Sequence, residues 1–347
     1  MLIICINELP HLAFVKSKGG EMMNHSTLTR FAGIAFSFVA FAGAAGAQDF
    51  PTRPITMIEP WEAGTSGDIT ARIVAEFASE ELGQPIAVQN IAGGGGAKAM
   101  LALSEADPDG YTIGNSWVAT QIMVPTFESR IGFEPMSFDP IALMWVNPFT
   151  LTVTADHPAN NVDEFVEWAK AQDGILRVGV CPAVSLPHVV MRRFLEVAGI
   201  TNYQPIPADG CETSNIQGLF DGSLDFTTGA LGAEKTYGDK IKSLAIFTQE
   251  RSPIEPDIPT AREQGYDLDW GAATAGWSGL VAPEGTDPER LKVLQDVFRD
   301  VINSEAFKKK MFEGGFTVQY MEPEEFRDLW QVSLERLGPA LDDLKKN

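Results

Sequence analysis

Residues 55–72 read Ile-Thr-Met-Ile-Glu-Pro-Trp-Glu-Ala-Gly-Thr-Ser-Gly-Asp-Ile-Thr-Ala-Arg. The first five include three large apolar side chains and predict a short buried strand. A loop with two glycines follows, and apolar residues then recur at helical spacing from Ile69 to Leu82, before Gly83. A strand that passes through a glycine-containing loop into a helix is the first half of a β-α-β unit.

The rest of the chain repeats this alternation of strand and helix. Further strands are expected at 86–91, 111–115, 176–180, 203–207 and 243–247. Helices are expected at 97–106, 162–172, 187–198 and 213–221, and three more start at Asp287–Pro288, Ser304 and Glu322–Pro323. The pattern predicts the α/β class, with mostly parallel sheets covered by helices.

The composition excludes several classes of protein. The chain has 347 residues, with 26 Lys and Arg against 47 Asp and Glu, so its net charge is −21. That acidity argues against a general nucleic-acid binder and against a protein held electrostatically on anionic lipid. Three Cys and four His are too few for a disulfide framework or a His-rich metal site. The glycine run at 93–96 lacks the spacing of a nucleotide-binding loop, so no cofactor is expected.

The first 47 residues predict a cleavable export signal. Arg30 precedes an apolar run at 31–42, and Ala45-Gly46-Ala47 fits a cleavage site before Gln48. The apolar core has about a dozen residues, which is short for a membrane span; a transmembrane anchor is the alternative. A start at Met22 or Met23 would give a signal of usual length, which makes 1–21 a candidate over-extension of the reading frame.

Loops that follow predicted strands are the candidate sites. In open α/β sheets, ligands bind outside the carboxyl ends of the strands. The loop at 60–68 supplies hydroxyls and a helix N-terminus that favours an anion, although Asp68 or Ser66 could simply cap the helix. Cys181 and Cys211 follow consecutive strands and are either a disulfide pair or two buried free thiols.

Sequence support for catalysis is weak. After the signal, the chain has two histidines, and His157 lies in a predicted solvated turn. His188 near Ser185 and Cys181 would suit a hydrolase, but no Gly-x-Ser-x-Gly elbow is present and a cap or loop histidine is the simpler interpretation. We therefore expect no enzyme.

Several ordered fragments carry a family resemblance. They are Phe50-Pro-Thr-Arg-Pro-Ile55, Gly64-Thr-Ser-Gly-Asp68-Ile-Thr-Ala-Arg72, Leu82-Gly-Gln-Pro85, Val88-Gln-Asn90, the glycines 93–96, Asp107-Pro-Asp-Gly-Tyr-Thr112, Leu224-Asp-Phe226, Arg251-Ser-Pro253, Asp257-Ile-Pro-Thr260 and Gly279-Leu-Val-Ala-Pro-Glu-Gly-Thr286. From Gln48 to about Trp330 the chain resembles the periplasmic substrate-binding proteins of tripartite tricarboxylate transporters, the Bug family.

The resemblance implies a type II periplasmic binding protein fold. Two α/β lobes, residues 48–150 plus 278–347 and residues 151–277, would be joined by two crossings and close on a small carboxylate or related solute. Delivery of that solute to membrane permease subunits is implied, and we expect a monomer. The alternative is a periplasmic sensor that feeds a signalling kinase.

The resemblance also implies a set of ligand-binding residues in the cleft. By position in this chain they are Trp61, Glu62, Ala63, Gly64, Thr65, Ser66, Asp68, Asn115, Ser116, Trp117, Cys181, Ser185, His188, Asp209, Thr228, Gly229 and Trp277.

Two acidic residues depart from the family pattern. Glu62 lies within a stretch that is usually Pro-Phe-Ala-Pro-Gly-Gly, and Asp209 replaces a usual Lys. Either Glu62 points outward, or the ligand is not a simple anion. A ligand with a cationic or donor group could pack against Trp61 and Trp117; alternatively, Trp61 only packs between the lobes.

Overall fold

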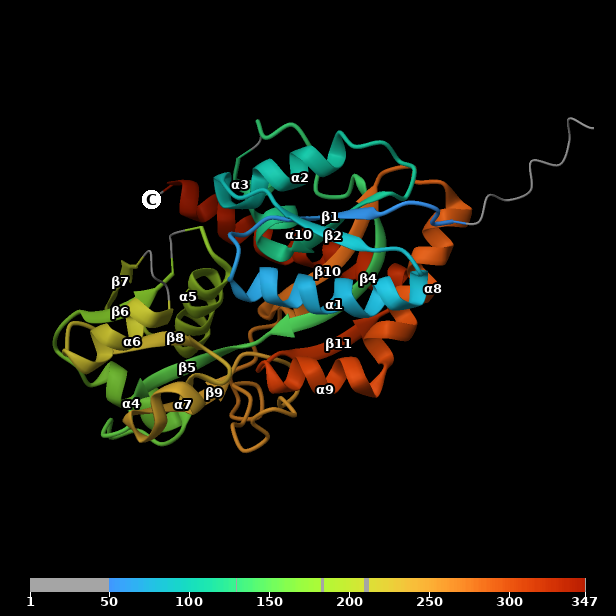
Figure 1. Cartoon of the computed structure of the whole chain (residues 1–347). Helices are drawn as coiled ribbons and strands as arrows, with labels where there is room; N and C mark the ends of the chain where they lie inside the picture. The colour runs from blue at the N-terminus through green and yellow to red at the C-terminus, as the bar shows by residue number, and fades with distance from the viewer. Residues whose placement is uncertain (1–49, 129, 182–183, 209–211, 347) are drawn as a thin grey trace, which may run out of the picture. The chain divides into compact units, whose positions relative to one another are not determined.

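The computed structural model describes residues 50–128, 130–181, 184–208 and 212–346 (Figure 1). The chain divides after Gln48, and all the described residues belong to the second unit. The predicted export signal therefore lies outside the described residues. Among those residues, no helix is both long enough and apolar enough to cross a membrane.

The larger sheet has six strands in the order β11-β4-β10-β3-β1-β2. Their bounds are β1 Ile55–Glu59, β2 Ile86–Asn90, β3 Thr112–Trp117, β4 Phe138–Asn147, β10 Gly276–Pro283 and β11 Thr317–Met321. β1 is parallel to β2 and β3, whereas β10 runs antiparallel to both β3 and β4, and β11 antiparallel to β4.

Helices cover both faces of this sheet. On one face lie α1 (Ser66–Leu82), α8 (Pro288–Asn303) and α9 (Glu305–Glu313), and on the other α2 (Ala97–Ser104), a π-helical turn (Val118–Met123), α3 (Val124–Phe127) and α10 (Pro323–Lys346). Side chains of a strand alternate between faces, so Met57 packs with the α1 side and Ile58 with the α2 side. Burial on both faces explains why Ile55, Met57 and Ile58 of β1 are apolar.

The second sheet has five strands in the order β7-β6-β8-β5-β9. Its elements are β5 Phe149–Thr154, α4 Val162–Lys170, β6 Leu176–Val180, α5 Leu186–Ala198, β7 Tyr203–Pro207, α6 Glu212–Phe220, β8 Phe226–Ala230, α7 Ala233–Tyr237 and β9 Ile241–Ile246. β6 is parallel to β7 and β8, whereas β5 is antiparallel to β8 and β9.

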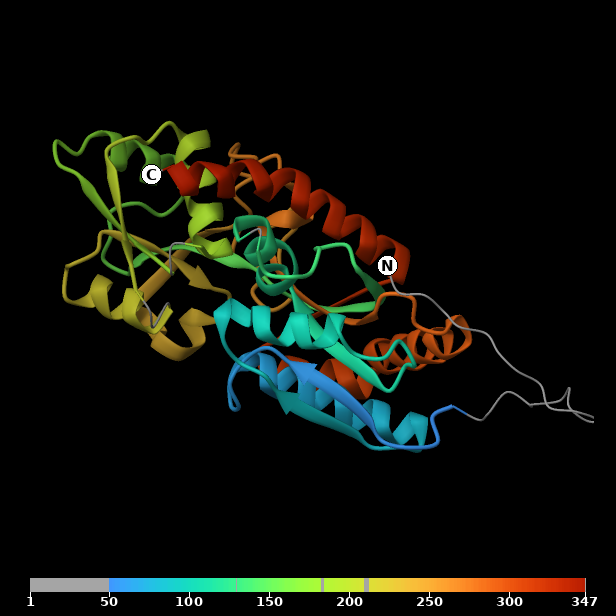
Figure 2. The same ribbon diagram turned by 90° about the horizontal axis from the view of Figure 1, so that it is seen from above.

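The chain crosses between the sheets twice. It leaves the first sheet at Asn147 and enters the second at Phe149, and it returns through residues 247–275 to β10. α10 connects the two parts again, because Arg192 of α5 lies 3.9 Å from Asp343 near the end of α10 (Figure 2). Two sheets with two crossings agree with the predicted fold class, whereas the exact lobe limits stay a prediction.

The structure corrects two details of the sequence-based fold. The sheets are mixed rather than mostly parallel. The sequence patterns did not predict the strands β4, β5, β8, β10 and β11, and every antiparallel pair in the two sheets includes at least one of them. α1 is capped by the Thr65 hydroxyl, which accepts the Asp68 N–H, and not by Ser66 or Asp68. The predicted caps at Asp287 and Ser304 are confirmed.

Candidate functional site

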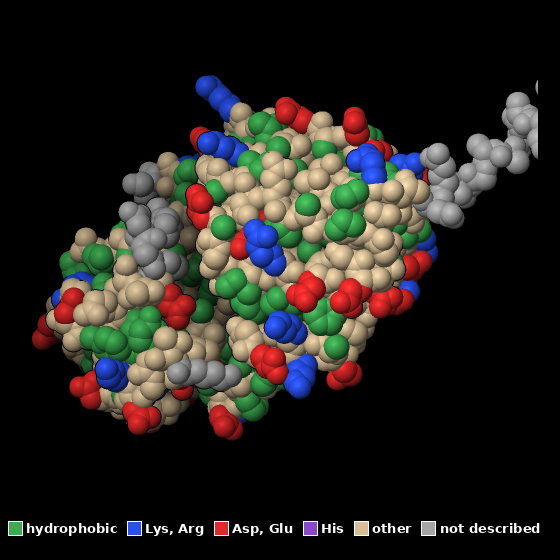
Figure 3. Space-filling view, viewed as in Figure 1, with side chains coloured by type: hydrophobic (Ala, Val, Ile, Leu, Met, Phe, Trp, Pro, Cys, Tyr) green, Lys and Arg blue, Asp and Glu red, His purple; other side chains and the backbone are tan. Residues whose placement is uncertain are grey.

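A cavity of about 450 Å³ lies between the two sheets, at the carboxyl ends of β3, β4 and β8. In Figure 3 the surface is hollowed between the part of the chain that carries α6 and the part that carries α1. The described lining residues are Ser66, Trp117, Trp145, Val146, Asn147, Pro148, Glu212, Ala230, Leu231, Gly232, Ala233, Thr236, Ile254, Glu313, Gly314, Gly315, Phe316 and Thr317. Both the position and the size suit a small-molecule site.

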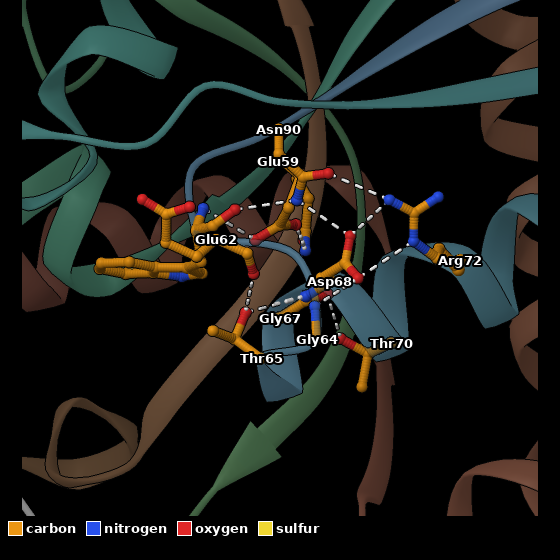
Figure 4. A network of polar contacts seen from close by, with 11 residues as sticks. Glu59, Glu62, Gly64, Thr65, Gly67, Asp68, Thr70, Arg72 and Asn90 are labelled. Atoms are coloured by element: carbon orange, nitrogen blue, oxygen red, sulfur yellow. Dashed lines mark hydrogen bonds and ion pairs between the residues drawn. The ribbon is translucent and has the colours of Figure 1, made fainter.

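A network around Asp68 fixes the loop between β1 and α1 beside this cavity (Figure 4). The Asp68 carboxylate, 4 % exposed, accepts hydrogen bonds from the Gly64 N–H at 2.9 Å and from Asn90 Nδ2 at 2.9 Å. Arg72 Nε donates to it at 3.0 Å, and this bond is the main reason why the pKa of Asp68 falls to about 2. These bonds within the protein hold the loop in position, and the predicted role of Asp68 in ligand binding stays a prediction.

Glu59, at the end of β1, is the residue that sequence reasoning missed. Its side chain is 0 % exposed, accepts the Trp61 N–H at 3.3 Å, and accepts Asn115 Nδ2 at 2.7 Å. Ser278 Oγ donates to Asn115 Oδ1 at 2.7 Å, which ties β10 to this group. Burial raises the pKa of Glu59 to about 7. An acid at the end of an otherwise apolar strand was the only signal in the sequence.

Three tryptophans form an edge-to-face chain that reaches the cavity. Trp61 and Trp117 have ring centroids 6.1 Å apart, and Trp117 and Trp145 have centroids 5.2 Å apart. Gly67 allows this packing, because a Cβ there would lie 2.5 Å from Trp61 Cδ1 and 2.6 Å from Glu59 Oε1. Neither Trp117 nor Trp145 has a hydrogen-bond partner for its indole N–H within the described part of the chain.

The predicted binding residues fall into separate groups. Ser66 and Trp117 line the cavity, while the side chain of Glu62 is exposed, is not part of the lining, and lies apart from the Asp68 network in Figure 4. Ala63, Gly64 and Thr65 are also exposed, and Asn115 and Ser116 are buried. Asp209 lies outside the described residues.

The predicted residues of the second sheet and of β10 are mostly buried. Thr228 Oγ1 donates to the Pro187 carbonyl at 3.3 Å, and Gly229 is buried beside it. Trp277 packs on Phe326 and its Nε1 lies 3.4 Å from Ser333 Oγ, so its indole belongs to the core.

Cys181 is buried and disulfide-bonded. Its expected partner, Cys211, lies outside the described residues, so the pairing stays a prediction.

Ser185 and His188, two of the residues considered for a hydrolase, lie at the start of α5. His188 is buried in the first turn of α5, and the Ser185 hydroxyl has no hydrogen-bond partner among the described residues, so it is not joined to His188 there. The expectation of a solvated His157 is wrong: it is 9 % exposed and packs edge-on against Trp168. No cluster of possible metal ligands occurs in the described ranges.

Comparison with known proteins settles the family. A family model described as the tripartite tricarboxylate transporter family receptor, TctC, matches residues 70–345. The chain belongs to this family. Among curated relatives, this TctC receptor is 29 % identical over 312 residues to the UPF0065 protein in the gbd 5′ region of Cupriavidus necator, covering 89 % of this chain and 93 % of that protein. It is 26 % identical over 317 residues to Protein BugT of Bordetella pertussis, covering 90 % and 96 %.

Solved structures agree with the fold of this receptor. A TctC solute binding protein from Polaromonas, without ligand, has a TM-score of 0.74 at 24 % identity, covering 85 % of this chain and 99 % of that one. R. palustris Rpa4515 with adipate has a TM-score of 0.70 at 24 % identity, covering 85 % and 98 %. The two-lobed α/β fold of solute-binding proteins is therefore confirmed.

Proposed function

We propose that this TctC receptor works in the periplasm, where it captures a small organic solute in the cavity between its sheets and delivers it to the permease of a tripartite transporter. The observation that carries the proposal is the cavity itself: strands of both sheets end there, and the chain crosses twice beside it. Such a site closes by a hinge motion that buries the ligand.

The proposal includes three points that follow from the sequence. Residues 1–47 are removed as an export signal, residues 48–150 plus 278–347 and residues 151–277 act as the two closing lobes, and the receptor is a monomer without enzymatic activity.

Binding is tested first by direct calorimetry with small organic acids. Adipate is a suitable first compound, because a relative with the same fold is recorded with it. A Ser66→Trp variant should abolish binding, since residue 66 is exposed at the start of α1 and lines the cavity. Ile175→Trp is the matched control, because Ile175 is 67 % exposed and is not among the lining residues. Equal binding by both variants would place the site elsewhere.

Delivery is tested in the native bacterium. Deletion of the gene should abolish uptake of the bound solute, and expression of the wild-type chain, but not of Ser66→Trp, should restore it. Normal uptake in the deletion strain combined with a lost transcriptional response would instead support the sensor alternative. Ligand-induced closure should lower the radius of gyration measured by small-angle X-ray scattering.

A further inference from the structure

The walls of the proposed cavity have an unusual charge for a receptor of organic acids. Glu212 and Glu313 are the charged residues among the described lining residues, and both are acidic. A carboxylate that approaches to about 4 Å from another carboxylate loses up to about a thousandfold in affinity at an effective dielectric constant near 20. This cavity is therefore poorly suited to a ligand with an anionic group at each end.

Glu212 is the more consequential of the two acids. It lies at the start of α6, is half-buried, and accepts a hydrogen bond from the Ala230 backbone N–H. Within the described side chains it has no ion pair, and burial raises its pKa. Glu313, in contrast, is exposed and lies 4.0 Å from Lys309 Nζ. A half-buried carboxylate without a counter-ion is stabilised when a cationic ligand binds beside it.

The remaining walls suit the two ends of a zwitterion. Trp117, Trp145 and Phe316 supply aromatic rings that can pack against the apolar chain between the two charged ends, and Trp117 lies beside the start of α1. α1 begins at Ser66, beside the cavity, and the partial positive charge of a helix N-terminus favours a carboxylate.

We propose that the solute of this cavity is an amine-bearing organic acid, with its ammonium group against Glu212 and its carboxylate toward the start of α1. This inference rests on the proposed function, because it assumes that the cavity is the binding site. The inference places the acidic contact at Glu212 of α6 instead of Glu62, because the side chain of Glu62 is exposed and is not part of the lining.

Three compounds of similar length separate the charge patterns: adipate with two carboxylates, 6-aminohexanoate with one carboxylate and one ammonium, and 1,6-diaminohexane with two ammonium groups. Calorimetry should show 6-aminohexanoate binding at least tenfold more tightly than either of the others. Tighter binding of adipate or of the diamine would overturn the inference.

Variants then test the assigned contact. Glu212→Gln keeps an oxygen that can accept the Ala230 N–H, so the fold should be retained, as circular dichroism will check. Glu212→Gln should weaken the binding of 6-aminohexanoate tenfold or more. It should also reduce the difference in affinity between 6-aminohexanoate and adipate. Glu196→Gln is the matched control, because Glu196 of α5 is exposed, lies 3.1 Å from an Arg193 guanidinium nitrogen and is not among the lining residues; it should change affinity less than threefold. Equal effects of the two variants would refute the role of Glu212.

Failure of the inference is distinguishable from failure of the proposed function. Ligand released from the denatured native protein is identified by mass spectrometry. If the released ligand is an acid without nitrogen and Ser66→Trp blocks its binding, the receptor function is supported and the inference of an amine-bearing ligand is overturned. Release of no ligand together with no binding of the three compounds would contradict both.

Discussion

Glu59→Gln should change how the stability of this receptor depends on pH. The Glu59 carboxyl is fully buried under the first loop, and its pKa is raised from 4.5 to about 7 by that burial. Gln has nearly the same shape but does not ionise. The amide of Asn115 can turn over to meet it, because the Ser278 hydroxyl that Asn115 contacts can either donate or accept.

The sign of the effect follows from proton linkage. Below pH 4.5 the carboxyl is protonated in both the folded and the unfolded chain. As pH rises from 4.5 to 7, the unfolded chain ionises while the folded chain keeps its proton, so the free energy of unfolding falls. The difference between pKa values of 4.5 and about 7 corresponds to about 3 kcal/mol in the free energy of unfolding. The wild type should lose this stability as the pH rises through the range, whereas Glu59→Gln should keep it.

Urea unfolding followed by circular dichroism between pH 4.5 and 8 measures this difference. The stability of Glu59→Gln relative to wild type should rise by about 3 kcal/mol across the range. Glu62→Gln is the matched control, because it removes an exposed carboxyl from the same loop, and its curve should stay parallel to that of the wild type. Parallel curves for Glu59→Gln and wild type would refute the reasoning.

Three further predictions concern the same framework. Gly67→Ala should destabilise the protein by about 1–3 kcal/mol, because its Cβ would overlap the packed rings. Gly174→Ala, where an added Cβ meets nothing within 4 Å and φ is not positive, should stabilise it by up to about 1 kcal/mol, and the opposite order in urea unfolding would contradict the packing. Thr65→Ala removes the cap of α1 and should lower stability by about 1 kcal/mol in the same assay, while an unchanged midpoint would show that the cap is dispensable. If Cys181 pairs with Cys211, reduction should add two hydrogens to the intact mass, and two alkylated thiols in the unreduced protein would exclude the bond.

Local sequence patterns predicted a large part of the fold. The helices α1, α5 and α8 and the strands β1, β6 and β7 were located because periodicity, capping residues and turns act over a few residues. The same patterns failed for β10, which forms its ladders with β3 and β4. The paired residues are 129 or more positions apart, from Gly276 and Asn147 upward, and such distant pairing leaves no local signal, because the backbone groups of β10 are satisfied by its partner strands.

The sequence by itself determined the class of fold, the family and two of the cavity residues, Ser66 and Trp117. The tertiary structure decided the electrostatics. Glu59 became a buried acid because Gly67 and Asn115 close over it, and Glu212 became a cavity wall because strands of both sheets end beside it. The charge state and contacts of a carboxyl depend on what surrounds it in space, which its sequence neighbours do not specify.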